Sequence, residues 1–345
     1  MAKTTKSAST LRRNSKRVLA ALQAAGVGPR ARALVSQSPP LRVLGLDLNT
    51  NSTGYAVLCE RGRVCEWGHV PTNHLASADV LRIARAVDDA MGGVLARVDA
   101  EKKATWRVGV EDFMRTYRFG RFHTRGIFQL AQLNGTVSYA CWRRLGDAES
   151  AQPVHTHPSA ARGFFGIAAT KAGKKATGES DIKEQVMAFV EREWRKQQEQ
   201  EAEEEGCSQQ ARLFLSRPGS DGACDVPADS SSRLFARTRG GNLSDAALDV
   251  ADAYVIAAFT RWRHFHDQLL LDADLAAQFA DAYVALTAAH ADARKSATPA
   301  AEERALAAMG AAARATHLRG LFAHGVDAWV RRAQAAPSGT WEDVV

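Results

Sequence analysis

Two acidic residues in this sequence follow short apolar runs and could serve as catalytic groups. Asp47 ends the run Arg42-Val-Leu-Gly-Leu, and Glu111 ends the run Trp106-Arg-Val-Gly-Val. Apolar runs of this length indicate buried strands, and a lone carboxylate at the end of such a strand is costly to bury. An Asp at a strand end can also cap a turn. Because the pattern occurs twice, we favour a chemical role for both residues.

Two further acids lie at the start of a segment with helical periodicity. Asp249 and Asp252 are three residues apart, so they lie on one face of the helix. The same face continues through Ile256 and Phe259, which are expected to be buried. Asp245 shares this face, but so near the helix start it is interpreted more simply as a favourable charge at a helix N-terminus. The pair is therefore expected to point inward.

Together the four acids suit metal-dependent chemistry. Converging carboxylates resist joint ionisation unless a cation neutralises them. Hard oxygen ligands without His or Cys select Mg²⁺ or Mn²⁺. Two such ions about 3.5–4 Å apart can activate a water molecule and stabilise the leaving oxygen in phosphodiester cleavage. The sequence therefore predicts a site, with two ions expected, whose catalytic and metal-binding residues are Asp47, Glu111, Asp249 and Asp252.

The elements that must position these acids alternate between strands and helices, as in an α/β protein. Five strands are expected, over residues 42–47, 53–58, 63–70, 106–111 and 153–157. The first three are expected to pair antiparallel, because their connections are short. Helices are expected over residues 77–101, 124–145, 180–194 and 244–266, with two or three more between 271 and 335.

Composition divides the chain into three parts. Residues 1–40 form a basic segment, 41–266 carry the acids, and 267–345 form an Ala-rich helical extension. A Gln/Glu run followed by a Gly-, Ser- and Pro-rich stretch interrupts the second part at 196–241. Because long structureless loops are uncommon inside compact domains, we interpret this stretch as a flexible insertion.

Charge is concentrated at the N-terminus. Residues 1–46 carry nine of the 45 Lys and Arg residues and no acid, which leaves 36 basic against 38 acidic residues in the remainder. An Arg- and Ser-rich, acid-free N-terminus is typical of an organelle transit peptide. The competing interpretation is a small basic DNA-binding module of two short helices.

Cysteine use and hydropathy argue against three features: a disulfide framework, a zinc site and a membrane-spanning helix. The five cysteines are odd in number and never spaced as C-x-x-C, which argues against a disulfide framework and a zinc site. No run of 18 apolar residues occurs, so no membrane-spanning helix is predicted.

Basic and aromatic residues directly after Glu111 are candidates for nucleic-acid contact. Arginines bind phosphates and aromatic rings stack on exposed bases, and this segment alternates the two types at Arg115, Tyr117, Arg118, Phe119, Arg121 and Arg125. A second basic patch contains Lys171, Lys174 and Lys175. Its glycines lack the spacing of a Walker A motif, so contact with the phosphate backbone is favoured over nucleotide binding. For the first segment, a loop with solvated charges and core aromatic residues remains the alternative.

Four segments in order resemble the motifs of the RuvC-type Holliday junction resolvases. They are residues 42–58, 108–114, 163–186 and 248–258, within a likeness that covers 41–266. The resemblance implies a ribonuclease H-like fold, a five-stranded mixed sheet flanked by helices, Mg²⁺ dependence, a homodimer and paired nicks in a four-way DNA junction. It also implies that Lys183 lies near the active site. The basic segment before the first strand is similar to that of fungal mitochondrial resolvases, which implies a mitochondrial protein; a nuclear or plastid location is the alternative.

Other functions remain open at this point. One is a non-catalytic ribonuclease H-like scaffold that binds nucleic acid in an organellar ribonucleoprotein. Another is a phosphotransferase of the actin and sugar-kinase type, whose first strand and turn read like Gly45-Leu-Asp-Leu-Asn-Thr. A third keeps the nuclease but changes its substrate to RNA–DNA hybrids or flaps.

Overall fold

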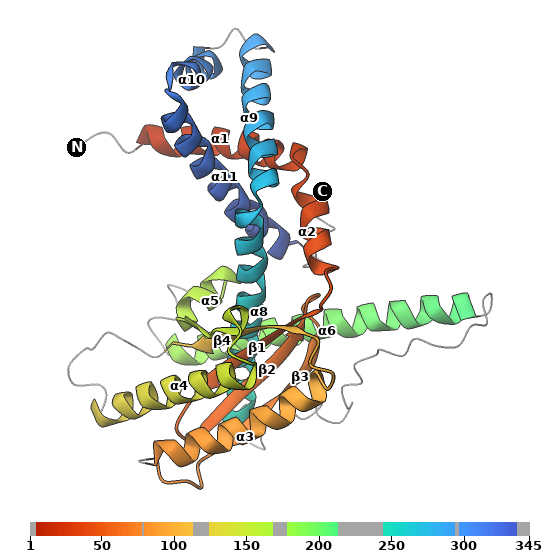
Figure 1. Ribbon diagram of the computed structural model, residues 1–345, viewed down its shortest axis with the longest axis vertical. Helices are drawn as coiled ribbons and strands as arrows, with labels where there is room; N and C mark the ends of the chain where they lie inside the picture. The colour runs from red at the N-terminus through yellow and green to blue at the C-terminus, as the bar shows by residue number, and fades with distance from the viewer. Residues whose placement is uncertain are drawn as a thin grey trace. The chain divides into compact units, whose positions relative to one another are not determined.

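The chain forms two compact units. The computed structural model describes residues 5–77, 79–112, 124–167, 178–212, 244–293 and 297–336 (Figure 1). The sheet unit comprises Ser38–Arg261, and the helical unit comprises Met1–Gln37 together with Trp262–Val345. Within these described ranges, no helix combines the length and hydropathy needed to cross a membrane.

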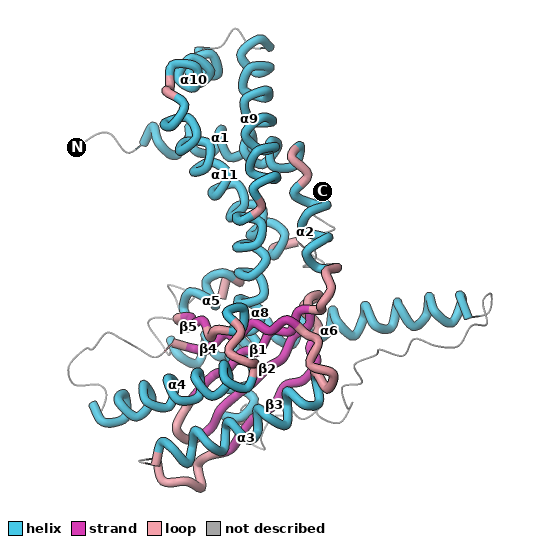
Figure 2. The backbone as a smooth tube through the Cα atoms, in the orientation of Figure 1, coloured by secondary structure: helices cyan, strands magenta, loops and turns pink. Residues whose placement is uncertain are grey.

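The sheet unit is built on five strands in the order β3-β2-β1-β4-β5 (Figure 2). The strands are β1 (Leu41–Leu48), β2 (Ser52–Cys59), β3 (Val64–Pro71), β4 (Thr105–Glu111) and β5 (Val154–Thr156). β1, β2 and β3 pair antiparallel, whereas β4 pairs parallel to β1 and to β5. This strand order with these directions is that of the ribonuclease H-like fold, so the α/β class and the mixed five-stranded sheet predicted from the sequence are confirmed.

Two helices cover one face of this sheet, α3 (Val80–Val98) and α4 (Thr124–Arg144) (Figure 1). Asp79 begins α3 by accepting a hydrogen bond from the Arg82 backbone N–H. The helices pack on the side chains of alternate strand residues, such as Leu44 and Leu46, which are fully buried. Side chains point to opposite faces in turn along a strand. The residues between these leucines therefore point to the other face.

The other face of the sheet is covered by α8 (Asp245–Leu271), with α6 (Gly178–Arg212) and the short α5 (Pro158–Phe164) beside it. The contact is close because small residues form it. A Cβ atom at Gly45 of β1 would overlap the α8 backbone at Ala253 and Ala257. Only glycine fits there, and it brings the helix backbone directly onto the strand.

The helical unit is built from segments at both ends of the chain. Its helices are α1 (Thr5–Ala24), α2 (Val27–Val35), α9 (Ala273–Ala293), α10 (Ala297–Ala308) and α11 (Ala311–Gln334). α1 packs against α9 and α11. Val18 and Leu22 of α1 are buried, and so are Phe279 of α9 and Trp329 of α11. C-terminal helices were expected from the sequence, but the packing of the basic N-terminal segment against them was not.

One helix differs clearly from expectation. The sequence predicts a helix over 180–194 followed by an insertion at 196–241, whereas α6 continues to Arg212. The Gln/Glu run at 197–205 therefore lies in helix, as the high helix propensity of Gln and Glu allows. Residues 213–241, the rest of the expected insertion, lie outside the described residues.

Candidate active site

Two of the four acids end neighbouring parallel strands. Leu46 of β1 pairs with Val110 of β4, so the next residues, Asp47 and Glu111, lie side by side at the same edge of the sheet. Both follow residues buried against α3 and α4. By the alternation of strand side chains they point to the face that α8 covers. The two carboxyl groups lie close enough for each to affect the pKa of the other.

The first turns of α8 bring the other two acids to the same edge. Ser244 begins the helix by accepting a hydrogen bond from the Ala247 backbone N–H at 3.1 Å, the cap position expected from the sequence. A Cβ atom at Gly54 of β2 would overlap the backbone of Asp249. Ser52, two residues earlier on the same face of β2, donates a hydrogen bond to Asp249 Oδ2. Asp249 is therefore fixed against the strand that neighbours β1.

Three of the four carboxyl groups have pKa values above their usual range. Burial raises the pKa of Asp47 well above its usual value, and the nearby charges of Glu111, Asp252 and Asp249 raise it further. Burial and the charge of Asp252 raise the pKa of Glu111 to about 7. Burial also raises the pKa of Asp249, although the Ser52 hydrogen bond opposes this shift. The structure thus brings together all four acids named from the sequence, close enough to interact electrostatically.

Arg162 lies among these acids and was not singled out from the sequence. Its Nη2 and Nε donate to Asp252 Oδ1 at 2.7 and 3.2 Å. Its charge also lowers the pKa values of Asp47 and Glu111, against the larger effects that raise them. The two paired residues are 90 positions apart, so no local pattern indicates the contact. An Arg on a short helix is ordinarily a solvated charge.

Asn134 is a second residue that sequence reasoning missed. Its side chain is 2% exposed and donates a hydrogen bond from Nδ2 to the Glu111 backbone oxygen at 2.9 Å. This hydrogen bond connects the middle of α4 to the end of β4. A signal was present, because Asn134 lies between Leu133 and Val137 on the buried face of α4, and a polar side chain there must find a hydrogen-bond partner.

The donor set of this cluster suits a hard divalent cation. Carboxylates that raise one another's pKa are stabilised by a cation, and oxygen ligands suit Mg²⁺ or Mn²⁺. Within the described residues, no three Asp, Glu, His or Cys side chains are already arranged as ligands of one ion. Asp252 is instead paired with a guanidinium.

The residues expected to contact nucleic acid are only partly described. Arg125 is exposed in the first turn of α4, and Lys183 is exposed on α6. The others lie outside the described residues, namely Arg115, Tyr117, Arg118, Phe119, Arg121, Lys171, Lys174 and Lys175. Their role as a nucleic-acid interface stays a prediction.

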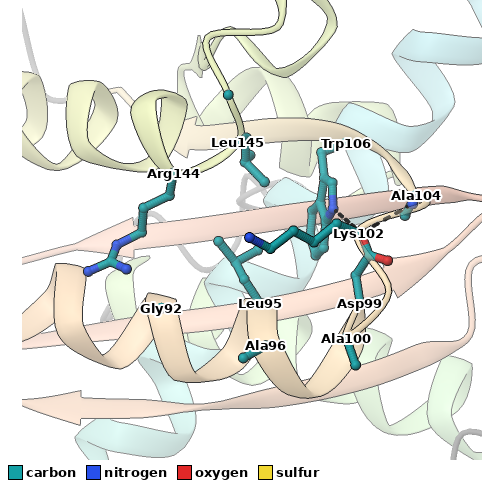
Figure 3. A pocket seen from close by; sticks show the side chains of 11 residues that line it. Gly92, Leu95, Ala96, Asp99, Ala100, Lys102, Ala104, Trp106, Arg144 and Leu145 are labelled. Carbon is teal, nitrogen blue, oxygen red and sulfur yellow. Dashed lines mark hydrogen bonds between the residues drawn. The ribbon is translucent and has the colours of Figure 1, made fainter.

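A cavity of about 700 Å³ lies near the start of β4, the end opposite Glu111 (Figure 3). Trp106, Leu95 and Leu145 line it together with Arg144. The Asp99 carboxylate in its wall accepts hydrogen bonds from the Trp106 indole and the Ala104 backbone. Glu111 lies seven residues after Ala104 along the strand, which places the two residues roughly 23 Å apart. The cavity is therefore separate from the acid cluster.

Comparisons with known proteins add one distant similarity. No protein-family model matches this sequence, and no curated protein matches it. Among solved structures, the chain is similar to T. thermophilus RuvC in complex with a Holliday junction substrate, with 12% sequence identity and a TM-score of 0.34. The similarity covers 66% of this chain and 95% of that one.

Proposed function

We propose that this protein is a metal-dependent endonuclease that cleaves phosphodiester bonds in branched DNA, with the four-way junction as its substrate. The observation that carries the proposal is the convergence of Asp47, Glu111, Asp249 and Asp252 from β1, β4 and α8. A structural role does not require four acids at one edge of a sheet, three of them with raised pKa values. The order of the four resolvase-like sequence motifs supports the choice of substrate.

The proposed chemistry assigns a task to each part of the site. Asp47 and Glu111 would hold an ion from the sheet, and Asp249 and Asp252 would hold one from the helix. Bound Mg²⁺ or Mn²⁺, as a pair, would lower the pKa of an attacking water and neutralise charge on the phosphate. Ser52 would keep the Asp249 carboxylate oriented through its hydrogen bond, and Asn134 would hold the backbone of Glu111.

Removal of one carboxylate is the direct test. Asp47→Asn and Glu111→Gln are each expected to reduce cleavage of a four-way junction with Mg²⁺ by about 10³-fold or more, on the order of the loss of a catalytic electrostatic group. Binding of the junction is expected to remain or to tighten, because each change removes a negative charge that repels the phosphates. Gel assays of cleavage and of binding measure both effects on one preparation.

The control is Asp89→Asn, which removes an exposed carboxylate of α3 and should cleave as the wild type does. A panel of junction, flap, RNA–DNA hybrid and plain duplex tests the substrate. Near wild-type cleavage by either active-site variant would refute the proposed site. Binding without cleavage of any substrate by the wild type would favour the non-catalytic scaffold instead.

A homodimer is part of this proposal, because paired nicks need two active sites. α4 offers a face for a second copy: Phe128 and Tyr139 are 63% and 60% exposed, and they lie three turns apart on one side of the helix. Gly135 between them has open space where a side chain would stand. Exposed aromatic side chains on one side of a helix favour association. A monomer in sedimentation equilibrium at micromolar concentration would contradict the dimer.

We also propose that the protein acts in an organelle, the mitochondrion first, on the basic composition of residues 1–40. Val18 and Leu22 are buried in the helical unit. Processing of a leader should therefore leave these residues in place. Fluorescence of a reporter fused to residues 1–40 tests this, and a cytosolic or nuclear signal would count against it.

A further inference from the structure

Arg162 puts a permanent positive charge among acids that are proposed to bind metal. We propose that Arg162 is the internal counter-ion of the acid cluster in the metal-free protein and that it competes with the first divalent ion for the charge of Asp252. This inference rests on the proposed function, since it assumes that the cluster binds metal. It goes further by assigning the state of the site before metal binds and a residue that sets its affinity for metal.

The geometry of the contact supports a specific ion pair. Nη2 and Nε of Arg162 both donate to the same Asp252 oxygen, Oδ1. The two side chains are 23% and 16% exposed, so water screens the pair only in part. Charge-assisted hydrogen bonds of this kind are about twice as strong as neutral ones. A ligand that needs Oδ1 must therefore displace a well-made contact.

Arg162 is held in place by its helix. Ala161 is fully buried, and the Phe164 ring packs edge-on against Phe259 of α8 at 5.4 Å between centroids. Phe259 lies seven residues after Asp252, two turns further along the same face of α8. α5 is thus anchored beside the row of α8 that carries the acid.

The charge of Arg162 acts on more than its hydrogen-bond partner. It lowers the pKa of Asp47 and also that of Glu111, so three of the four carboxyl groups feel it. A divalent ion beside the same groups would meet this positive charge at short range, and like charges disfavour each other strongly where solvent is limited. Metal binding must then weaken the Arg162–Asp252 pair, and the pair must weaken metal binding by the same factor, since coupling between two binding events is reciprocal.

The alternative role of Arg162 predicts the opposite result. If Arg162 only holds Asp252 in the orientation of a metal ligand, its removal must weaken metal binding. If it competes with metal, its removal must strengthen metal binding. The measured affinity for metal therefore separates the two roles without any activity assay.

The test titrates Mn²⁺ alone into the full-length protein by calorimetry. Arg162→Gln and Arg162→Met are expected to bind the first Mn²⁺ at least about fivefold more tightly than the wild type, the lower end of typical coupling between sites. Their metal-free forms should melt at lower temperature, and saturating Mn²⁺ should remove most of that difference. Because a variant can be destabilised without metal, the rise in melting temperature with Mn²⁺ gives a second measure of affinity.

Two variants serve as controls. Arg162→Lys keeps the positive charge and should bind Mn²⁺ as the wild type does. Arg144→Gln breaks a comparable pair, in which Arg144 Nη2 donates to Asp88 Oδ2 at 2.8 Å near the separate cavity. It should leave Mn²⁺ affinity unchanged.

The outcomes separate this inference from the proposed function. Equal or weaker Mn²⁺ binding by both neutral variants overturns the counter-ion role. A wild-type protein that binds no Mn²⁺, or that binds it equally well after Asp252→Asn, overturns the proposed metal site and this inference with it. Wild-type binding that Asp252→Asn abolishes, without a gain in the Arg162 variants, overturns the counter-ion role alone.

Discussion

At the scale of single residues, Glu111 should keep its proton in the folded protein at a pH at which the unfolded chain has lost it. Burial and the charge of Asp252 raise the pKa of Glu111 to about 7, so in the metal-free protein this carboxyl group is expected to hold a proton below about pH 7. Metal ligands must give up such protons, so metal binding should release one below pH 7. The affinity for metal should therefore rise with pH.

The stability of the metal-free protein should fall as pH rises. Glu111 has a folded pKa of about 7 against an ordinary 4.5, so between these values the folded state binds more protons than the unfolded state. Its contribution is fully present below pH 4.5 and is lost by about pH 7. In EDTA, Glu111→Gln should thus gain stability relative to the wild type across this window, by about 1–3 kcal/mol. Melting temperatures from pH 4.5 to 8 measure the difference, and a difference independent of pH would contradict the assignment.

At the scale of elements, the distance between α8 and the sheet decides where the acids stand. Two glycines permit this approach, Gly45 on β1 and Gly54 on β2, since a side chain on either would overlap the α8 backbone. The helix therefore rests on the strands through backbone contacts. A displacement of α8 carries Asp249 and Asp252 with it, away from Asp47.

Gly54→Ala should consequently affect both stability and the site. The added methyl group must push the Asp249 backbone away, and overpacking of this kind costs about 1–3 kcal/mol. We expect a lower denaturation midpoint and weaker Mn²⁺ binding. Gly135→Ala is the control, because nothing stands within 4 Å of its Cβ position and Ala favours a helix over Gly by about 1 kcal/mol. Unchanged stability in Gly54→Ala would contradict the close packing of α8.

Much of the sheet unit could be predicted from sequence because its patterns are local. Apolar runs ending in Asp47 and Glu111 marked β1 and β4, and the spacing of Asp249 and Asp252 marked the inward face of α8. The contacts that complete the site are not local. Ser52 reaches Asp249 across 197 positions, and no periodicity encodes that contact. The length of α6 was missed for another reason: a polar Gln/Glu run has high helix propensity but no apolar stripe to reveal it.

At the scale of the whole molecule, the two units should respond to different substitutions. Gly325 of α11 is the clearest point of contact with α1, because a Cβ there would stand 2.7 Å from Val18 Cγ1. The sheet unit contains neither residue. A bulky side chain at Gly325 should therefore separate α11 from α1 and leave the acid cluster unchanged.

Gly325→Leu tests this independence. We expect it to lower the stability of the helical unit by about 1–3 kcal/mol through overpacking, seen in calorimetry as a downward shift of one of two thermal transitions. Cleavage and Mn²⁺ binding should persist at temperatures where the sheet unit is folded. Gly320→Leu, on the same helix with open space around its Cβ position, should leave both transitions near wild type. One cooperative transition that moves as a whole would show that the units unfold together.

The pairing of the first helices with the last ones has a consequence for synthesis on the ribosome. Domains generally fold as units as the chain emerges, the N-terminal parts first. A nascent chain that has reached residue 272 already contains all of Ser38–Arg261, but of the five helices of the helical unit named above it contains only α1 and α2. The sheet unit can therefore fold while the basic α1 still lacks α9 and α11. Throughout that interval Val18 and Leu22 stay without their packing partners on α9 and α11, until the end of the chain is synthesised and covers them.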